Sequence, residues 1–425
     1  MTRRFCVAGG VETGREHAAL ALLNTDSHPA RVAVTLYFAD GTTRTATRAV
    51  PPNAQRSYAV AGLTDARGSF GLCVAADRAV SGQLTLTRPG QDGDSLLGSP
   101  DLGRHWSLAE GYTGLTFHET VALLNPGATT ATVSVHLLLS GGTGNRTVTE
   151  IVGAHSERVV GVNSLIGKKG TAVSIVADAD RAILVERTLT FGKGDYGLTM
   201  REAAPAASTS WTFAEGSTAK PFETFLTVLN PQDSTARVTA AFFGRDGRRL
   251  GSKTLILVSR SRATIKINDI VPGTSSVASV VTSDRAVVVE RPEYLGSPNA
   301  GGVAGSDVFG RNGAARRWAV PGGLLAGGDS EFLLLYNPAS RAIAVDLTFY
   351  NTAKGGTVTR RVTVPAAARY TFDVSAYQRG TKKNPGPTLT ASHGETLRSD
   401  GGFIVERSVL GPRHDALQSS QGLAQ

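Results

Sequence analysis

The stretch WTFAEGSTAKPFETFLTVLNP runs from Trp211 to Pro231, and three other stretches of the chain resemble it. They are WSLAEGYTGLTFHETVALLNP from Trp106, WAVPGGLLAGGDSEFLLLYNP from Trp318 and FCVAGGVETGREHAALALLNT from Phe5. Each begins with an aromatic residue and has an asparagine 19 residues later. A catalytic site is normally needed once, whereas a structural unit is often used several times. The repetition therefore predicts a modular protein.

The four copies keep one internal register. Their asparagines are separated by 101, 105 and 107 residues, and a glycine lies 14 residues before each of them. Constant offsets over four copies identify a true internal repeat. The shared positions are the aromatics Phe5, Trp106, Trp211 and Trp318, and the asparagines Asn24, Asn125, Asn230 and Asn337.

Each copy has the residue pattern of β-strands. A short apolar run precedes the asparagine, and alternating apolar residues follow it, as in Val133, Val135 and Leu137. Alternation with period two places such residues on one face of a strand, against a core. Asp-Gly or Gly-Gly pairs then supply the positive φ of tight hairpins. The copy is expected to close with two strands around a short turn at Asp77, Asp180, Asp284 and Asp400.

These patterns predict an all-β chain of four tandem immunoglobulin-like β-sandwich domains, each with about seven strands. An up-and-down barrel in each copy is the alternative fold. Connectors rich in Gly, Ser, Ala and Pro separate the copies, and the domains are expected to follow one another in a row. The predicted domains span residues 1–98, 99–204, 205–310 and 311–425.

The shared pattern W…AEG-T…LNP…SDRA-VVER resembles a family of tandem β-sandwich repeats in bacterial surface and secreted proteins. The resemblance covers essentially the whole chain. The fourth copy lacks the AEG, and the first has Gln83-Leu84 where the others have a Glu-Arg pair: Glu186-Arg187, Glu290-Arg291 and Glu406-Arg407. The resemblance implies an extracellular structural or adhesive module, and it brings no catalytic residues with it.

Motifs for enzymatic chemistry are absent: the sequence has no HExxH, no GxSxG and no P-loop. We therefore expect no catalytic residues and no cofactor. The primary hypothesis is a non-enzymatic modular extracellular protein, a stalk, fibre or matrix subunit that contacts other copies of itself or surface proteins. It is placed outside the cell or on its surface, although the sequence opens without a signal peptide. The sequence has no apolar run of 18 residues, so no membrane span is expected.

The alternative function is a binding module for anionic cell-wall glycans. The net charge of +9 favours anionic partners. The fourth copy also has an enlarged stretch at residues 377–399, where a binding loop is predicted with Arg379, Lys382, Lys383 and His393. Nucleic acid is not expected as a partner, because aromatic residues make up only 6% and are not interleaved with basic clusters.

The other recurring residues receive structural interpretations. The asparagines are expected to hold turns through bonds to nearby backbone. The tryptophans are expected to pack at domain edges, with carbohydrate stacking as the alternative. The Glu-Arg pairs are expected to bind partners on adjacent strands. A recurrent arginine, at Arg56, Arg158, Arg262 and Arg369, is expected to stack or cap at a strand start.

Two further questions concern cysteines and metals. Cys6 and Cys73 are the only cysteines, and they are predicted either to form a disulfide or to remain two buried thiols. The histidines are dispersed and complete no metal set, so no metal site is predicted. A calcium ion held between domains by Asp92, Asp94 and Asp101 is a minor alternative, since these residues lack an ordered ligand spacing.

Overall fold

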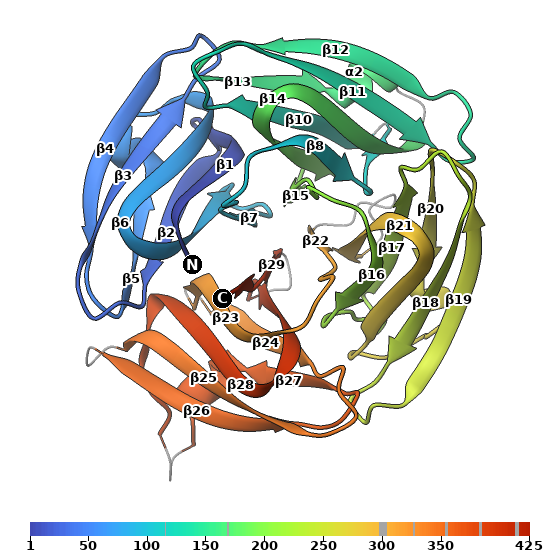
Figure 1. Ribbon diagram of the computed structural model, residues 1–425. Helices are drawn as coiled ribbons and strands as arrows, with labels where there is room; N and C mark the ends of the chain where they lie inside the picture. Colours follow the sequence, from blue (N-terminus) through green and yellow to red (C-terminus); the bar gives the residue numbers. More distant parts are fainter. Residues whose placement is uncertain are drawn as a thin grey trace.

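The computed structural model is built almost entirely of β-strands (Figure 1). It describes residues 1–114, 116–167, 170–296, 304–325, 328–352, 356–381, 385–412 and 416–425. These residues form four sheets of antiparallel strands, with seven, eight, seven and eight strands in chain order. The predicted all-β class with four tandem antiparallel units is confirmed. We refer to the four units as repeats 1 to 4.

The elements recur in the same order in every repeat. Repeat 1 contains β1 (Thr2–Glu12), β2 (His17–Asn24), β3 (Ala30–Tyr37), β4 (Thr43–Val50), β5 (Ala54–Ala59), α1 (Val60–Thr64), β6 (Gly68–Thr87) and β7 (Asp94–Leu97). Repeat 2 contains β8 (Gly103–Leu108), β9 (Tyr112–Thr113), β10 (Phe117–Asn125), β11 (Ala131–Leu139), β12 (Arg146–Val152), β13 (Ser156–Gly161), α2 (Val162–Ile166), β14 (Thr171–Phe191) and β15 (Gly197–Glu202).

Repeats 3 and 4 follow the same plan. Repeat 3 contains β16 (Ser208–Phe213), β17 (Phe222–Asn230), β18 (Ala236–Phe243), β19 (Arg249–Leu257), β20 (Ser261–Lys266), the 3-10 helix η1 (Ile267–Asp269), β21 (Ala278–Leu295) and β22 (Ala304–Phe309). Repeat 4 contains β23 (Ala315–Leu324), β24 (Ser330–Tyr336), β25 (Ile343–Thr352), β26 (Thr357–Val364), β27 (Arg369–Asp373), α3 (Val374–Arg379), β28 (Leu389–Leu410), β29 (Leu417–Gln421) and β30 (Leu423–Ala424).

Each repeat is a two-layer sandwich whose layers share one long strand. In repeat 1 the first part of β6 pairs with β1 and β3, and its last part pairs with β2 and β7. The alternating apolar residues point into the core between the layers, as predicted, and Val133, Val135 and Leu137 are all buried. The core therefore follows directly from the period-two pattern.

The long strand corrects one prediction. We expected two strands and a turn at the recurrent aspartate, but β6 and its counterparts run through that position without a break. The aspartate carboxylate accepts the backbone N–H of a neighbouring strand instead: Asp77 from Arg31 and Asp180 from Thr132, both at 2.8 Å. This bond holds the strand where it passes from one layer to the other.

The four repeats close into a ring (Figure 1). Strands β23, β25 and β28 of repeat 4 contact β2, β5 and β6 of repeat 1, just as β1 and β6 contact repeat 2. The short strands β7, β15, β22 and β29 meet around the centre of the ring. The expected row of domains is therefore replaced by a closed arrangement. No helix in the described part of the chain has the length and hydropathy to cross a bilayer.

Candidate functional site

The Glu-Arg pairs are the main polar contacts between repeats. The Arg187 Nη2 atom lies 2.8 Å from Glu290 Oε2 of the next repeat, and Arg291 Nη2 lies 3.0 Å from Glu406 Oε2. The arginine side chains of these pairs are fully buried. We expected partners on adjacent strands of one domain, and the partner is instead the acid of the following repeat.

The acids of these pairs also bind backbone N–H groups of the AEG segments. Glu290 Oε1 accepts the N–H groups of Ala109 and Glu110, at 2.5 and 3.1 Å. Glu406 Oε1 accepts the N–H of Ala214 at 2.7 Å. Each carboxylate is thus held by an arginine and by backbone donors of the preceding repeat, which satisfies a buried charge.

The junction between repeats 4 and 1 lacks both the backbone donor and the acid of the other junctions. Pro321 occupies the position of Ala109 and has no N–H to donate. The residue of repeat 1 that corresponds to Glu290 is Gln83, whose Oε1 accepts from Arg407 Nη2 at 2.8 Å. The two departures noted in the sequence, the missing AEG and the missing acid, therefore meet at the contact that closes the ring.

The recurrent arginine divides into two groups. Arg262 and Arg369 lie at junctions: Arg262 Nη2 is 3.5 Å from Glu110 Oε2, and Arg369 Nε donates to the carbonyl oxygen of Ala214 at 2.8 Å. Arg56 and Arg158 are exposed. The alignment of Arg56 and Arg158 with Arg262 was wrong by one residue. Arg262 pairs with the leucine before the recurrent asparagine, and in repeats 1 and 2 that leucine pairs with Gln55 and Glu157 instead.

Gln55 and Glu157 make the junction contacts that the exposed arginines do not. Glu157 Oε2 accepts the N–H of Gly9 at 2.9 Å, and Gln55 Oε1 accepts the N–H of Gly322 at 2.7 Å. Burial raises the pKa of Glu157 to about 8, although the bond from Gly9 opposes this rise. Glu157 is therefore a neutral acid at the junction around neutral pH.

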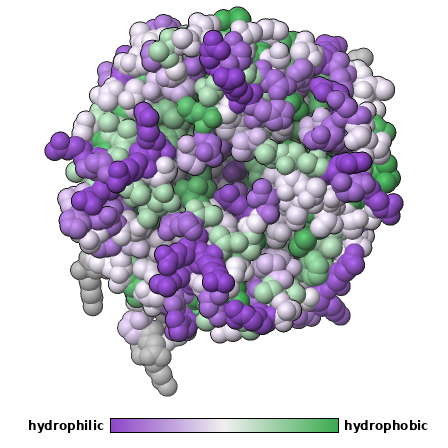
Figure 2. Space-filling view, in the orientation of Figure 1, coloured by the Kyte–Doolittle hydropathy of each residue, from purple (hydrophilic) through white to green (hydrophobic). Residues whose placement is uncertain are grey.

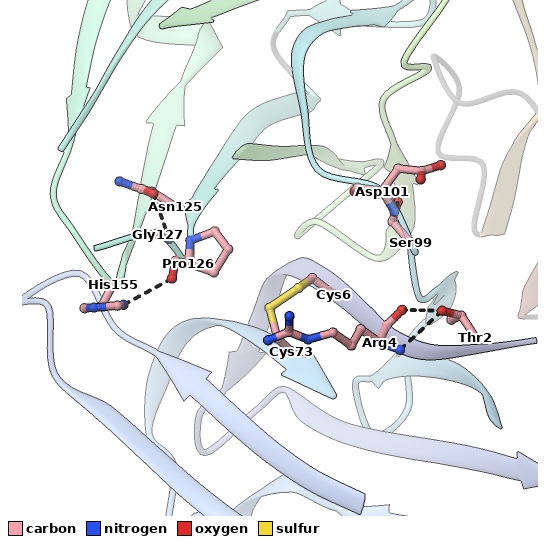
Figure 3. The surroundings of a disulfide bond; sticks show 10 residues. All are labelled: Thr2, Arg4, Cys6, Cys73, Ser99, Asp101, Asn125, Pro126, Gly127 and His155. Atoms are coloured by element: carbon pink, nitrogen blue, oxygen red, sulfur yellow. Dashed lines mark hydrogen bonds between the residues drawn. A yellow bond between two sulfur atoms is a disulfide. The ribbon is translucent and has the colours of Figure 1, made fainter. Parts of the chain in front are cut away.

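The asparagines and tryptophans have structural contacts. The Asn125 amide donates to the carbonyl oxygens of Thr129, Val152 and Gly153. Its Oδ1 accepts the N–H of Gly127 (Figure 3). The same pattern recurs at Asn24, Asn230 and Asn337. The indole N–H groups donate to backbone carbonyls inside each repeat, and all three rings are buried: Trp106, Trp211 and Trp318.

The two cysteines form a disulfide between adjacent strands (Figure 3). Cys6 of β1 lies directly opposite Cys73 of β6 in the antiparallel register. Of the two alternatives left by the sequence, the structure has the bonded one.

The predicted binding loop of repeat 4 is not a single surface. Arg379 is exposed at the end of α3, whereas His393 lies on β28 and is fully buried. Lys382 and Lys383 lie outside the described residues. Strand β28 begins at Leu389 and takes up the second half of the stretch, so about half of the apparent loop is a lengthened strand.

His393 belongs to a buried polar cluster that the sequence did not reveal. Its Nε2 atom lies 3.1 Å from Glu395 Oε1 and 3.3 Å from Glu331 Oε2. Burial lowers the pKa of His393, but the two carboxylates outweigh it and raise the pKa to about 10. A comparison of the repeats by strand pairing would have indicated the site. At the position of His393 the other copies have apolar residues: Phe70, Val173 and Val277.

The centre of the ring is held by Asp92. Its carboxylate accepts backbone N–H groups from all three other repeats, those of Leu198, Gly305 and Leu417, at 2.9 to 3.3 Å. Asp94 accepts the N–H of Met200 at 2.8 Å. Backbone donors thus surround Asp92 and Asp94, whereas Asp101, the third aspartate suggested as a calcium ligand, is exposed. Burial raises the pKa of Asp92 well above its usual range.

The centre also contains a cavity of about 380 Å³, lined by the ends of the inner strands. Arg201, Glu202 and Arg311 are among its polar lining residues. Figure 2 shows a hollow with a hydrophilic floor near the middle of the ring face.

A second cavity, of about 190 Å³, lies between repeats 2 and 3, and we call it the junction pocket. Four aromatic side chains line it, and the Glu110–Arg262 ion pair supplies its polar groups; the aromatics are Tyr112, Phe117, Phe225 and Tyr294. Burial raises the pKa of Glu110 and lowers that of Arg262, although each group moderates the shift of the other. The Lys266 ammonium lies 5.6 Å from the centre of the Phe225 ring.

Comparisons with known proteins give no family. No protein-family model matches the chain, and no curated protein matches it. A Thermotoga maritima 1070 structure is 18% identical over 24% of this chain and 93% of its own, with a TM-score of 0.23. The Anabaena sensory rhodopsin transducer is 26% identical over 20% and 95%, with a TM-score of 0.19. A tetra-tandem repeat from the extending region of a large adhesion protein is 16% identical over 99% of both chains, with a TM-score of 0.13.

Proposed function

We propose that the chain is a non-enzymatic extracellular adhesive module, a closed ring that binds acidic sugar units of surface glycans in the junction pocket. The observation that carries this proposal is the pocket itself, where aromatic walls surround one ion pair between repeats 2 and 3. Concave sites with apolar walls and a few fixed polar groups are typical of small-ligand binding. We therefore propose this pocket, and not the predicted loop of repeat 4, as the glycan-binding site.

The pocket lining suits the two sides of a sugar ring. Tyr112 and Phe225 are partly exposed, so their faces are available to stack against the C–H groups of a pyranose. The Arg262 guanidinium donates to Ser174 through Nε and pairs with Glu110 through Nη2, so an acidic ligand would share or replace the Glu110 contact on its planar fork. Lys266 near the Phe225 ring and the net charge of +9 add attraction for an acidic ligand.

The same lining supports binding without catalysis. Glycoside hydrolysis generally requires two carboxyl groups that flank the scissile bond. Among the described residues that line the junction pocket, Glu110 is the single carboxylate, and it is paired with Arg262. The buried acids Glu290 and Glu406 are occupied in contacts between repeats.

An extracellular location is supported by the disulfide between Cys6 and Cys73. Disulfides persist in secreted and surface proteins and are rare in reducing compartments. The resemblance to repeats of bacterial surface proteins favours the same location. Fractionating the producing cells and detecting the chain outside the membrane would test this part of the proposal.

The binding test compares an oligosaccharide of uronic acids with its neutral analogue by isothermal titration calorimetry. We expect the acidic sugar to bind, and we expect Tyr112→Ala and Phe225→Ala to weaken binding about fivefold each, since an aromatic stacking contact contributes about 1 kcal/mol. Tyr58→Ala removes a partly exposed tyrosine of repeat 1 and serves as the matched control. Equal binding by all variants would refute the pocket as the site.

A second candidate role, self-association, is favoured by two outer strands. Ile151 on β12 and Ile256 on β19 are 57% and 58% exposed, and each strand lies at a sheet edge. Exposed edges with apolar side chains can pair with another chain. Light scattering over a concentration series should show association that Ile151→Ser with Ile256→Ser abolishes. A monomer at every concentration would refute this role.

A further inference from the structure

We propose that Glu331, His393 and Glu395 of repeat 4 form a binding site for one divalent transition-metal ion, with Zn²⁺ as the preferred ion. The three ligand atoms are His393 Nε2, Glu331 Oε2 and Glu395 Oε1, and all lie within 4.8 Å of one another. All three side chains are buried. The proposal is independent of the junction pocket, which lies between other repeats.

The spacing of the ligand atoms fits a metal ion. Nε2 lies 3.1 and 3.3 Å from the two carboxylate oxygens. Zn–N and Zn–O bonds of about 2.0–2.2 Å in a tetrahedral arrangement place neighbouring ligand atoms about 3.3–3.5 Å apart. The cluster therefore needs to expand by only a few tenths of an ångström to accept the ion. Imidazole and carboxylate together are ligands that Zn²⁺ accepts.

The orientation of the imidazole supports the same conclusion. His393 Nδ1 lies 3.3 Å from the carbonyl oxygen of Thr390, which can only accept a hydrogen bond. This contact keeps a proton on Nδ1, so Nε2 is the nitrogen that faces the two carboxylates. The metal ion would take the place of the proton that Nε2 carries in the metal-free protein, and the carbonyl would hold the ring in position. Nε2 and Glu395 Oε1 have no aligned hydrogen bond, although they lie 3.1 Å apart, so both atoms are available as ligands.

Gly323 leaves room beside the ligand atoms. A Cβ at this position would lie 2.8 Å from Nε2 and 2.9 Å from Glu395 Oε1. The missing side chain provides space next to both ligands for the ion or for a bound water in the open position. Arg407 supports the site from the other side, because its Nη1 lies 3.4 Å from Glu395 Oε2 and orients that carboxylate.

Repeat 2 supplies a matched control. At the positions of Glu331, His393 and Glu395 it carries Glu119, Val173 and Ile175, and these residues pack in its core. The double substitution His393→Val with Glu395→Ile therefore rebuilds an arrangement that the fold already accommodates. It leaves the ion pairs of His105 and His136 with Asp178 unchanged, so any zinc held there is the same in both chains.

The test measures zinc per chain by mass spectrometry after expression in medium supplemented with Zn²⁺, because the buried site has to be loaded as the chain folds. We expect about one more zinc ion per chain in the natural sequence than in the double variant. A competing chelator should then show at least tenfold weaker Zn²⁺ binding in Glu331→Gln, which preserves side-chain shape.

Cobalt substitution gives a second readout. Co²⁺ in the site should produce visible absorption bands of a low-symmetry N,O environment, and the double variant should lack them. Equal zinc content in the natural and variant chains would overturn the proposal. NMR of protein grown with zinc gives a further check. A His393 ring that is protonated on both nitrogens would also overturn the proposal, because a proton would then occupy the place of the ion. If the double variant does not fold, Glu331→Gln alone decides through its zinc content.

Discussion

Replacing Glu157 with glutamine should remove the share of the stability loss between about pH 5 and 8 that comes from this one buried acid. Glu157 is 2% exposed at the junction of repeats 1 and 2, and burial raises its pKa from 4.5 to about 8. Gln55 occupies the equivalent position in repeat 1 and accepts a glycine N–H in the same way. The substitution Glu157→Gln is therefore already compatible with this type of junction.

The sign of the effect follows from proton binding. Below about pH 4.5 both the folded and the unfolded chain hold the proton on Glu157. Between about pH 4.5 and 8 the unfolded chain releases it and the folded chain retains it, so each pH unit lowers the free energy of unfolding by about 1.4 kcal/mol. Between pH 5 and pH 8 the loss amounts to about 4 kcal/mol, and glutamine does not contribute it.

Denaturant unfolding at pH 5, 6, 7 and 8 measures the difference between the two chains. Glu157 also raises the pKa of the buried Glu186, so the subtraction reports Glu157 together with its effect on that neighbour. The gap between the curves should widen steadily towards pH 8, in favour of the variant. Arg158→Ala, at the exposed neighbouring position, is the control and should follow the natural chain. Parallel curves for Glu157→Gln and the natural chain would mean that Glu157 is ionised when folded.

Three other perturbations test the ring and the disulfide. Arg291→Met should lower the free energy of unfolding by about 3–5 kcal/mol, because it leaves the buried Glu406 without its cation; an unchanged denaturation midpoint would contradict this. Asp92→Ala should speed hydrogen exchange at the three backbone amides that it binds, one in each other repeat, and exchange at only one of them would contradict a shared central contact. Cys6→Ala with Cys73→Val should cost about 4 kcal/mol for the 67-residue loop and abolish the effect of reductant on unfolding.

The local structure was predictable from sequence because it depends on neighbouring residues. Alternation at Val133, Val135 and Leu137 sets one buried face, and an asparagine before a turn needs only nearby carbonyls. The sequence did not reveal that Glu157, and not Arg158, takes the position of Arg262. The recurring arginines suggested an alignment that differs by one residue from the strand pairing. In a strand such a shift moves a side chain to the opposite face, which is why Arg158 is exposed and Glu157 is at the junction.

The ring was not predictable from the pattern of one repeat. It depends on contacts between residues far apart in the chain, such as Ala109 with Glu290 and Gln55 with Gly322. The cluster of His393 and Glu331 likewise joins two strands separated by the long middle of repeat 4. The junction pocket gave no signal in the sequence, since each repeat supplies only half of its lining.

The polar pairs at the junctions give the ring a defined order. Where a repeat carries glutamate in its AEG segment, the next repeat presents an arginine, as with Glu110 and Arg262. Where glycine stands there instead, the next repeat presents an acceptor for its N–H, as with Gly9 and Glu157. Docking the Glu110 edge against Glu157 would bury two carboxyl groups together without the arginine or the glycine N–H that each binds in its own junction, which opposes the wrong partner. Head-to-tail interfaces close when the rotation between units completes a circle. The chain thus combines four similar sandwiches with two kinds of junction that are not interchangeable, and this accounts for the Gly9 and Gly322 departures in the first and fourth copies.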